Sequence, residues 1–378
     1  MAPPPPLDLI ADVAIEIFLR FPPDEPEHLF RAAFVCKHWL RLCDPVFRRR
    51  YRAFHGAPPL LGLLHRRQLR HGYPAARFVS TTSMPDFPHP GSGGRRTRPL
   101  DCRHGRVLVH MLEKEDVDLL VWDPVTGDRH AFPQPDMELL IYTAAVSCAV
   151  EGCDHLGCHV GPFGVIFVAT DKHDEIIKAS MYSSETGAWS VPVSLDNGSE
   201  FYAKHRQDAI EDELYYVQPR RAAIIRDDVY FTLRQDNTII KYDRGLNCLS
   251  MINPPSPNAN NYCISLMEGE FRRSCRMGTN LRVLELEATI PIDNVDCVVP
   301  ETTMPIDHLE FGRSVVGFAE GVDVIFISTD VGLFTIEIKS GQVKKVDKPG
   351  VYYSVLPYMS FYTPDGGRLS SLAKLTDV

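Results

Sequence analysis

Two cysteines and two histidines fall within seven residues of the stretch EGCDHLGCHVGPFG (151–164), and these side chains could do chemistry. They are Cys153, His155, Cys158 and His159. Thiolates and imidazoles are ligands that Zn²⁺ prefers in proteins, and a cysteine beside a histidine can act as a nucleophile with its base. Three interpretations follow: a metal site, a catalytic pair or a structural loop.

The spacing favours the structural loop. Structural zinc sites usually combine two separated ligand pairs, whereas four ligands within seven residues would have to wrap tightly round one ion. Cys148 is the only further donor nearby. Catalysis would need a third group that orients the histidine, and the sequence offers none that is recognisable. We therefore interpret the stretch as a loop leading into the strand PFGVIFVAT (162–170), and predict no metal, no other cofactor and no catalytic residue.

Composition and charge indicate a globular protein. Of the 378 residues, 44% are hydrophobic and 24% charged, which is far from the composition of a disordered chain. Residues 1–110 hold 17 Lys and Arg against 9 Asp and Glu, and the net charge of −9 therefore places −17 on the remainder. The basic stretch HRRQLRHG (65–72) has one aromatic neighbour, so nucleic-acid binding is not expected.

The ten cysteines are too sparse for a disulfide scaffold and are interpreted as reduced thiols. The sequence has no apolar run of about 18 residues and no secretory signal pattern, so a membrane is not an expected partner. We expect a cytoplasmic or nuclear location. The motifs G-x-x-x-x-G-K, G-x-S-x-G and H-E-x-x-H are also absent.

The elements nearest the amino end are expected to be three short helices. Apolar residues between 9 and 21 surround a narrow polar stripe, and this first helix should end at Pro22-Pro23. Asp24 is expected to cap a second helix with Leu29 and Phe34 on its apolar side, and a third, interrupted at Asp44-Pro45, should follow. Because about fifty residues bury little apolar surface alone, a protein partner is indicated.

These residues resemble an F-box, the three-helix module with which substrate receptors bind the Skp-type adaptor of cullin-RING ubiquitin ligases. The resemblance rests on E-I-x-L-R-x-P-P, L-x-R-A-x-x-V-C-K-x-W and D-P-x-F-R-R within residues 8–56. The continuation HGAPPLLGLL resembles grass F-box proteins with a β-rich carboxy-terminal domain. One departure is Ile10-Ala11, where the family usually has Leu-Pro. By position, the resemblance assigns adaptor contact, or alternatively a place in the module's own core, to Ile10, Val13, Ile17, Leu29, Val35 and Trp39.

Beyond residue 57 the pattern changes to short alternating strands. A strand, a polar turn and a second strand recur roughly every 45 to 60 residues, each time after another apolar strand, which is typical of propeller blades. The paired strands are expected at 119–132, 179–191, 239–251, 284–299 and 333–346, after strands at 105–111, 163–170, 227–233, 261–267 and 321–328. Strands from 57–100 and 352–364 could close a further blade.

The predicted fold is thus α+β and multidomain. It comprises a disordered start (1–6), an F-box-like helical domain (7–55) and an all-β propeller (57–378) of about six blades, with five or seven as alternatives. The kelch double glycine does not recur, so a kelch-like blade type rests on period and pattern, whereas the F-box-associated propeller is implied by the resemblance.

The expected function is that of a non-catalytic substrate receptor of a Skp–cullin–F-box ubiquitin ligase. The helices would bind the adaptor and, through it, the cullin, while propeller loops would bind an unknown protein substrate. Two alternatives remain: a propeller enzyme or sugar-binding protein whose helices only cap it, and a scaffold that binds a partner without ligase assembly.

Overall fold

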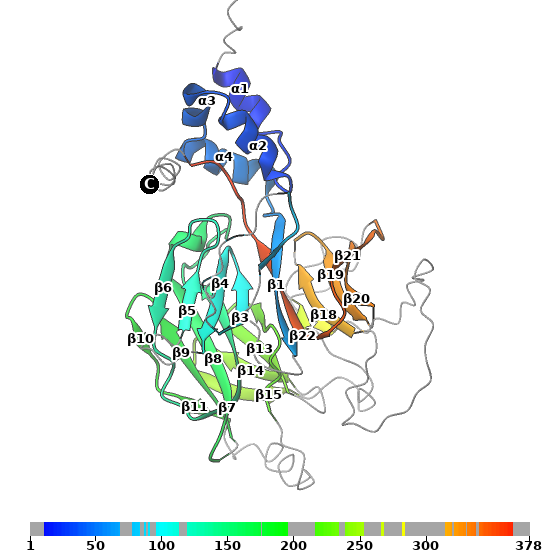
Figure 1. The fold of residues 1–378 in the computed structure, drawn as a ribbon. Coiled ribbons are helices and arrows are strands. Elements are labelled where there is room, and N and C mark those ends of the chain that lie inside the picture. The colour runs from blue at the N-terminus through cyan, green and yellow to red at the C-terminus, as the bar shows by residue number, and fades with distance from the viewer. Residues whose placement is uncertain are drawn as a thin grey trace, which may run out of the picture.

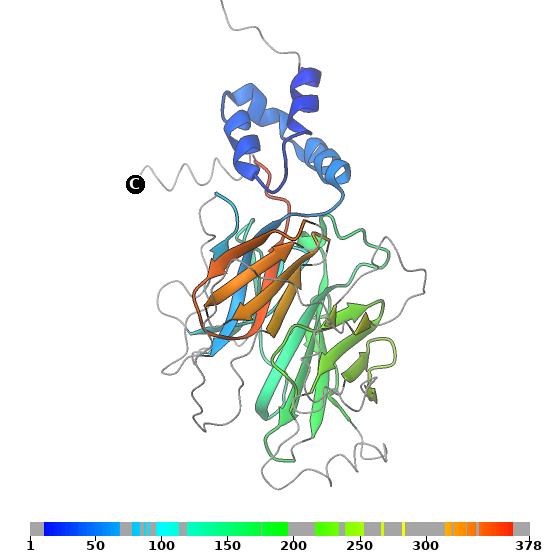
Figure 2. The ribbon, with the colours of Figure 1, turned by 90° about the vertical axis from the view of Figure 1, so that its right-hand side faces the viewer.

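The first part of the chain forms a small helical domain at one end of a β-rich region (Figures 1 and 2). The computed structural model describes residues 11–68, 78–83, 87, 90, 96–112, 119–174, 176–195, 216–233, 239–252, 266–267, 282–283, 314–319, 321–329, 331–337 and 340–365. The helices are α1 (Ala11–Phe18), α2 (Pro26–Ala33), α3 (Lys37–Leu42) and α4 (Pro45–His55). The predicted disordered start and Ile10 lie outside the described residues.

Four helices stand where three were predicted, because the interruption at Asp44-Pro45 separates two of them. Pro45 disfavours helical backbone at Asp44, and the Asp44 carboxylate accepts a hydrogen bond of 2.7 Å from the Phe47 N–H, which starts α4. The prediction that Asp24 caps the second helix was wrong. Its N-cap is Glu25, whose side chain makes no capping bond, and Pro26 occupies the first turn.

The β-rich region consists of short antiparallel strands in six sheets among the described residues. The strands are β1 (Leu60–Gln68), β2 (Phe78–Ser80), β3 (Thr97–Arg103), β4 (Arg106–Met111), β5 (Leu119–Trp122), β6 (Arg129–Phe132), β7 (Leu139–Cys148), β8 (Phe163–Asp171), β9 (Ile177–Ser183), β10 (Ala188–Trp189), β11 (Val193–Ser194), β12 (Ala223–Ile225), β13 (Asp228–Thr232), β14 (Ile239–Asp243), β15 (Cys248–Ile252), β16 (Leu266–Met267), β17 (Arg282–Val283), β18 (Ser314–Ala319), β19 (Val324–Thr329), β20 (Gly332–Glu337), β21 (Val343–Asp347) and β22 (Val351–Met359). Successive strands pair with each other in the sheets β3–β6, β12–β15 and β18–β21, and β7–β10 follow the same plan with β11 also on β9.

Four of the five predicted strand pairs are present. They are β5 with β6, β9 with β10, β14 with β15 and β20 with β21. The fifth, expected at 284–299, lies outside the described residues. Gly127, Gly187 and Gly341 adopt positive φ in their turns as a hairpin glycine should, but in the third turn the left-handed residue is Asn247.

The two ends of the β-rich region pair with each other. β1 runs antiparallel to β22, with Leu63 opposite Pro357 and His65 opposite Val355, and β2 completes this sheet. Figure 1 shows the last strand beside the first, with the chain then returning to the helices. This pairing is the one predicted for the closing blade. The described residues do not show a closed ring, and the number of blades stays a prediction.

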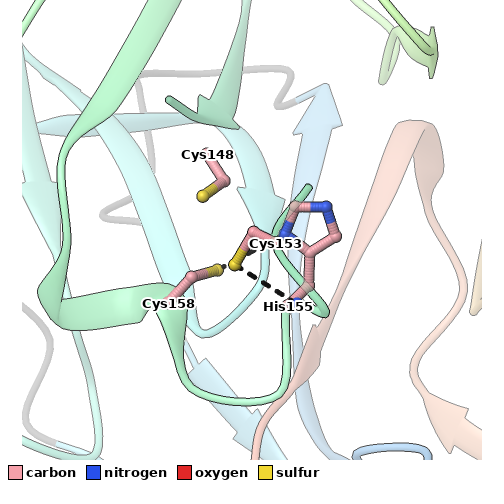
Figure 3. Close-up of side chains that lie close together, drawn as sticks. All are labelled: Cys148, Cys153, His155 and Cys158. Carbon is pink, nitrogen blue, oxygen red and sulfur yellow. Dashed lines mark hydrogen bonds between the residues drawn. The ribbon is translucent and has the colours of Figure 1, made fainter. Parts of the chain in front are cut away.

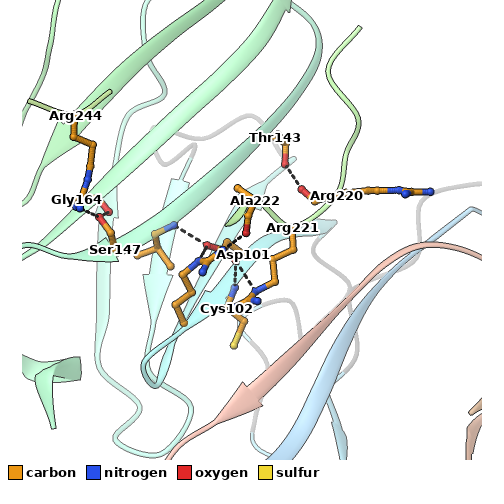
Figure 4. A network of polar contacts seen from close by, with 11 residues as sticks. Asp101, Cys102, Thr143, Ser147, Gly164, Arg220, Arg221, Ala222 and Arg244 are labelled. Atoms are coloured by element: carbon orange, nitrogen blue, oxygen red, sulfur yellow. Dashed lines mark hydrogen bonds and ion pairs between the residues drawn. The ribbon is translucent and has the colours of Figure 1, made fainter. Parts of the chain in front are cut away.

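A buried polar network joins three of the sheets (Figure 4). Asp101 of β3 is fully buried and makes an ion pair of 2.8 Å with Arg103, which in turn donates to the carbonyl oxygen of Ala222, just before β12. The Asp101 carboxylate also accepts a hydrogen bond of 2.9 Å from the Val146 N–H in β7. One carboxylate thus fixes β3 and β7 relative to the strand that follows Ala222.

No helix in the described part of the chain is long and apolar enough to cross a bilayer.

Candidate functional site: the helical surface and the Cys/His loop

The helical domain exposes apolar side chains in unusual number for its size. Of thirteen large hydrophobic residues exposed in the described structure, six belong to residues 11–55. Val13 and Ile17, one turn apart on α1, are 48% and 44% exposed, and Val35, after α2, is 67% exposed. Single exposed apolar residues are normal, but six on one small domain make the helical domain the candidate interaction surface of the described structure.

Leu29 and Trp39 are less exposed than Val13, Ile17 and Val35. Leu29 is fully buried in the domain's own core, which favours the alternative stated for it. Trp39 is half-buried, and its ring meets Phe18 edge-on at 5.5 Å, so it both supports the core and keeps some exposed surface. Adaptor contact by Val13, Ile17, Val35 and Trp39 stays a prediction.

Phe34 was placed with the apolar side of the second helix, and the structure corrects this. The helix ends at Ala33, Phe34 is its C-cap, and the Phe34 side chain is 53% exposed. Val46 and Phe54 of α4 are also exposed, at 64% and 58%. Phe34 and Val35 follow directly after the last turn of α2, so they do not continue its apolar face. This position is the signal that the sequence-based prediction missed.

The Cys/His stretch 151–164 lies at the junction between the helical domain and the β-rich region. It forms most of the loop between β7 and β8, and the bond from the Ala149 N–H to the Pro162 carbonyl, 3.1 Å, closes the loop at its base. Leu156 packs against the core of the helical domain, and a Cβ placed on Gly157 would lie 2.4 Å from Nη1 of Arg52 in α4. The prediction of a loop is confirmed, and this loop also packs against the helical domain.

His159 lies apart from the other three candidate ligands, Cys153, His155 and Cys158. Its Nδ1 lies 2.6 Å from the Asp123 carboxylate, and Tyr358 of β22 lies 3.5 Å from the other oxygen of Asp123. Burial alone would raise the pKa of Asp123, but hydrogen bonds, the first of them to His159, outweigh it and lower that pKa. His159 therefore binds the loop to Asp123, directly after β5, and through Asp123 to Tyr358 of β22.

Cys148, rather than His159, lies beside the other three candidate ligands. Because it ends β7, the hairpin with β8 brings it back to the loop, where it faces Cys153, His155 and Cys158 (Figure 3). One ligand atom from each of these four residues lies within 4.8 Å of the other three. Cys148 and Cys158 are buried, Cys153 is half-buried, and His155 reaches solvent. We call these four residues the Cys₃His cluster.

The chemistry of the cluster differs from that of a catalytic pair. Burial, with the thiols of Cys148 and Cys153 adding to it, raises the pKa of Cys158 to about 12. A thiol with a raised pKa is a poor nucleophile, and the neighbouring His159 is bound to Asp123. Three thiols and an imidazole that face each other are, however, a donor set for a soft or borderline metal ion.

The ring of His104, from the turn between β3 and β4, covers one side of the cluster. It stacks on His155 with centroids 4.0 Å apart and planes 4° from parallel. Burial lowers the pKa of His104 to about 3, with the nearby His155 and Arg103 adding to the effect. His104 therefore stays neutral, and its flat face fixes the orientation of the His155 ring.

Comparisons with known proteins bear on the helical domain. Residues 6–50 match the family model described as the F-box domain. A comparison with curated proteins found no match.

Several solved structures resemble parts of the chain weakly. The extracellular domain of a putative one-component system from B. thetaiotaomicron is 12% identical, with 68% of this chain and 28% of that chain covered, at a TM-score of 0.30. AztD of Citrobacter koseri is 9% identical, with 76% of this chain and 56% of that chain covered, at a TM-score of 0.25. The WD40 domain of SCAP from fission yeast is 9% identical, with 70% of this chain and 57% of that chain covered, at a TM-score of 0.29.

The chain spans less than two thirds of each of these three proteins, and likeness at this level assigns no function. The match that carries weight is the one over the helices, where the exposed apolar residues gather. Residues 6–50 of this chain are an F-box domain.

Proposed function

We propose that the protein is a substrate receptor of a Skp–cullin–F-box ubiquitin ligase, in which the F-box domain binds a Skp-type adaptor and the β-rich region binds a protein substrate. The observation that carries this proposal is the coincidence of the F-box match with the exposed apolar residues Val13, Ile17 and Val35. The adaptor would cover these residues, and apolar contacts of this kind contribute strongly to binding when water is excluded.

The mechanism is proximity. A receptor that holds its substrate near a ubiquitin-loaded enzyme raises the effective concentration of the reacting groups, and it needs no catalytic residue of its own. The geometry matters because the substrate must lie within reach. The packing of Leu156 and Phe361 into the core of the helical domain supports a fixed position of the F-box domain on the β-rich region.

We also infer that the β-rich region is a β-propeller. Sheets of four antiparallel strands in sequence order support this, as does the pairing of β1 with β22, which joins the two ends of the region in one sheet. Loops between such sheets vary without disturbing the sheets, so substrate binding is assigned to loops.

Co-purification of the intact protein with a Skp-type adaptor tests the proposal. Ile17→Asp and Val35→Asp each place a charge on the expected interface without touching the core, and each should weaken adaptor binding about tenfold or more. Val191→Asp is the matched control, since Val191 is 80% exposed in the β-rich region and should leave binding unchanged.

Failure of the intact protein to bind any Skp-type adaptor would contradict the proposal. Equal binding by Ile17→Asp, Val35→Asp and Val191→Asp would contradict the assigned surface. Circular dichroism confirms that the variants are folded before their affinities are compared.

A further inference from the structure

We propose that the Cys₃His cluster (Cys148, Cys153, His155 and Cys158) is a structural zinc site that holds the loop on which the F-box domain rests. Three cysteines and one histidine in tetrahedral geometry are one of the standard ligand sets of structural Zn²⁺. A sulfur-rich set also disfavours Mg²⁺ and Ca²⁺, which prefer oxygen ligands.

The distances within the cluster suit one ion. Zinc bonds of about 2.3 Å to sulfur and about 2.0 Å to nitrogen place a sulfur and a nitrogen ligand about 3.5 Å apart. Cys158 Sγ and His155 Nδ1 are 3.6 Å apart. No pair of ligand atoms is more than 4.8 Å apart, so the widest pairs would have to approach by about 1 Å, which side-chain rotation supplies.

The backbone of the loop is arranged for sulfur ligands. The N–H of Val150 donates to Cys148 Sγ and the N–H of His155 donates to Cys153 Sγ, both at 3.4 Å. Such donors favour the thiolate that a metal ion requires. Gly152 and His155 both have positive φ, 64° and 58°, and these two left-handed residues turn the chain so that its ligands face back toward Cys148.

The surroundings of the cluster act as supports for its ligands. His104 stacks on the His155 ring, and Nη2 of Arg106 donates to the carbonyl oxygens of Cys158 and Gly161. Residues that orient metal ligands in this way are a regular part of zinc sites. His155 is exposed, which leaves one side open for the ion to enter.

Zinc would give the loop the stability that its backbone lacks. Between β7 and β8 the only regular element is a single 3₁₀ turn, Cys158–Val160, although most hairpin loops have only two to five residues. Leu156 and Gly157, which contact the helical domain, lie between the ligands His155 and Cys158. An ion bound here would fix this contact and with it the position of the F-box domain on the loop.

Metal analysis of the intact protein, purified without chelator from zinc-supplemented cells, tests the proposal. Wild-type protein should carry about one zinc per chain. The double variant Cys153→Ser/His155→Ala changes the two more exposed ligands, so the buried packing is preserved, and it should retain less than a tenth of that zinc. Replacement of zinc by Co²⁺ should produce the visible absorption of tetrahedral cobalt with thiolate ligands.

Two control variants define the ligand set. Cys248→Ser removes an exposed thiol outside the cluster, and His159→Gln removes the imidazole that binds Asp123; both should keep about one zinc per chain. Zinc-free wild-type protein would overturn the proposal, as would full zinc content in the double variant. A disulfide between any two of the three thiols, found by mass spectrometry without reductant, would also overturn it.

Discussion

The ring of Tyr362 lies 4.7 Å from the ring of Phe30, so the segment after the last strand packs on the second helix. Beside it, Phe361 is 6% exposed and belongs to the core of the helical domain, where its ring meets Tyr51 at 6.1 Å. Residues from near the other end of the chain thus complete the core of the F-box domain. A domain of about fifty residues buries little of its surface and is only marginally stable alone, so such additions stabilise it.

Phe361→Ala should therefore destabilise the helical domain. Removing a buried phenylalanine side chain typically costs about 3–5 kcal/mol, from lost burial and the cavity left behind. Urea unfolding of the intact protein measures the change, and hydrogen exchange of peptides from α2 and α4 locates it. Phe54→Ala is the matched control, because Phe54 is 58% exposed on α4, and it should change stability by less than about 0.5 kcal/mol. Equal effects of the two variants would contradict this account of the junction.

Much of the fold could be predicted because the deciding signals are local. Pro22 and Pro23 lie between α1, which ends at Phe18 and so earlier than predicted, and α2, while Pro45 begins α4. The turn glycines at 127, 187 and 341 lie between alternating strands whose pairing follows from adjacency. The strand pairs β5–β6, β9–β10, β14–β15 and β20–β21 were predicted in this way.

The strands β3 and β7 were missed because their burial does not alternate. β3 carries Asp101 and Arg103 in buried positions, and two charged residues in a short segment predict a loop until the ion pair between them is known. β7 is buried along most of its length, so it lacks the period of two that identifies a half-exposed strand.

The Cys/His stretch shows the same limit at a candidate site. Spacing alone grouped His159 with Cys153, His155 and Cys158, because these four are neighbours in sequence. The structure exchanges His159 for Cys148, since the β7–β8 pairing brings the end of β7 to the loop and Asp123 draws His159 away. Ligand sets that depend on strand pairing cannot be read from spacing.

Asp101→Ala should be strongly destabilising, because it leaves the guanidinium of Arg103, 2% exposed, without its carboxylate. Breaking a buried ion pair from one side typically costs about 3–5 kcal/mol. Urea unfolding is the measurement. In the control, Asp227→Ala, the lost carboxylate is 83% exposed and 3.3 Å from Arg244, so the cost should stay below about 1 kcal/mol. A similar small cost for Asp101→Ala would show that the network of Figure 4 does not hold the sheets together.

The last prediction concerns Asp347, which ends β21 and ties it to the sheet of β1 and β22. Its carboxylate lies 2.7 Å from Nε2 of His65 and accepts a hydrogen bond of 3.0 Å from the Tyr352 hydroxyl. Burial alone would raise the pKa of Asp347, but hydrogen bonds from the Lys348 N–H and from these two side chains outweigh it, so the pKa is lowered.

A carboxyl group whose pKa is lowered by folding stabilises the protein above its unfolded pKa of about 3.9, and this stabilisation is lost as the pH falls through the lower folded value. Wild-type protein should therefore be more stable than Asp347→Asn at neutral pH, and the difference should shrink as the pH falls below about 3.9, because a protonated aspartic acid resembles asparagine. Urea unfolding of both proteins from neutral pH into acid measures the difference. A difference that stays constant or grows in acid would mean that the Asp347 carboxylate does not hold β21 to the closing sheet.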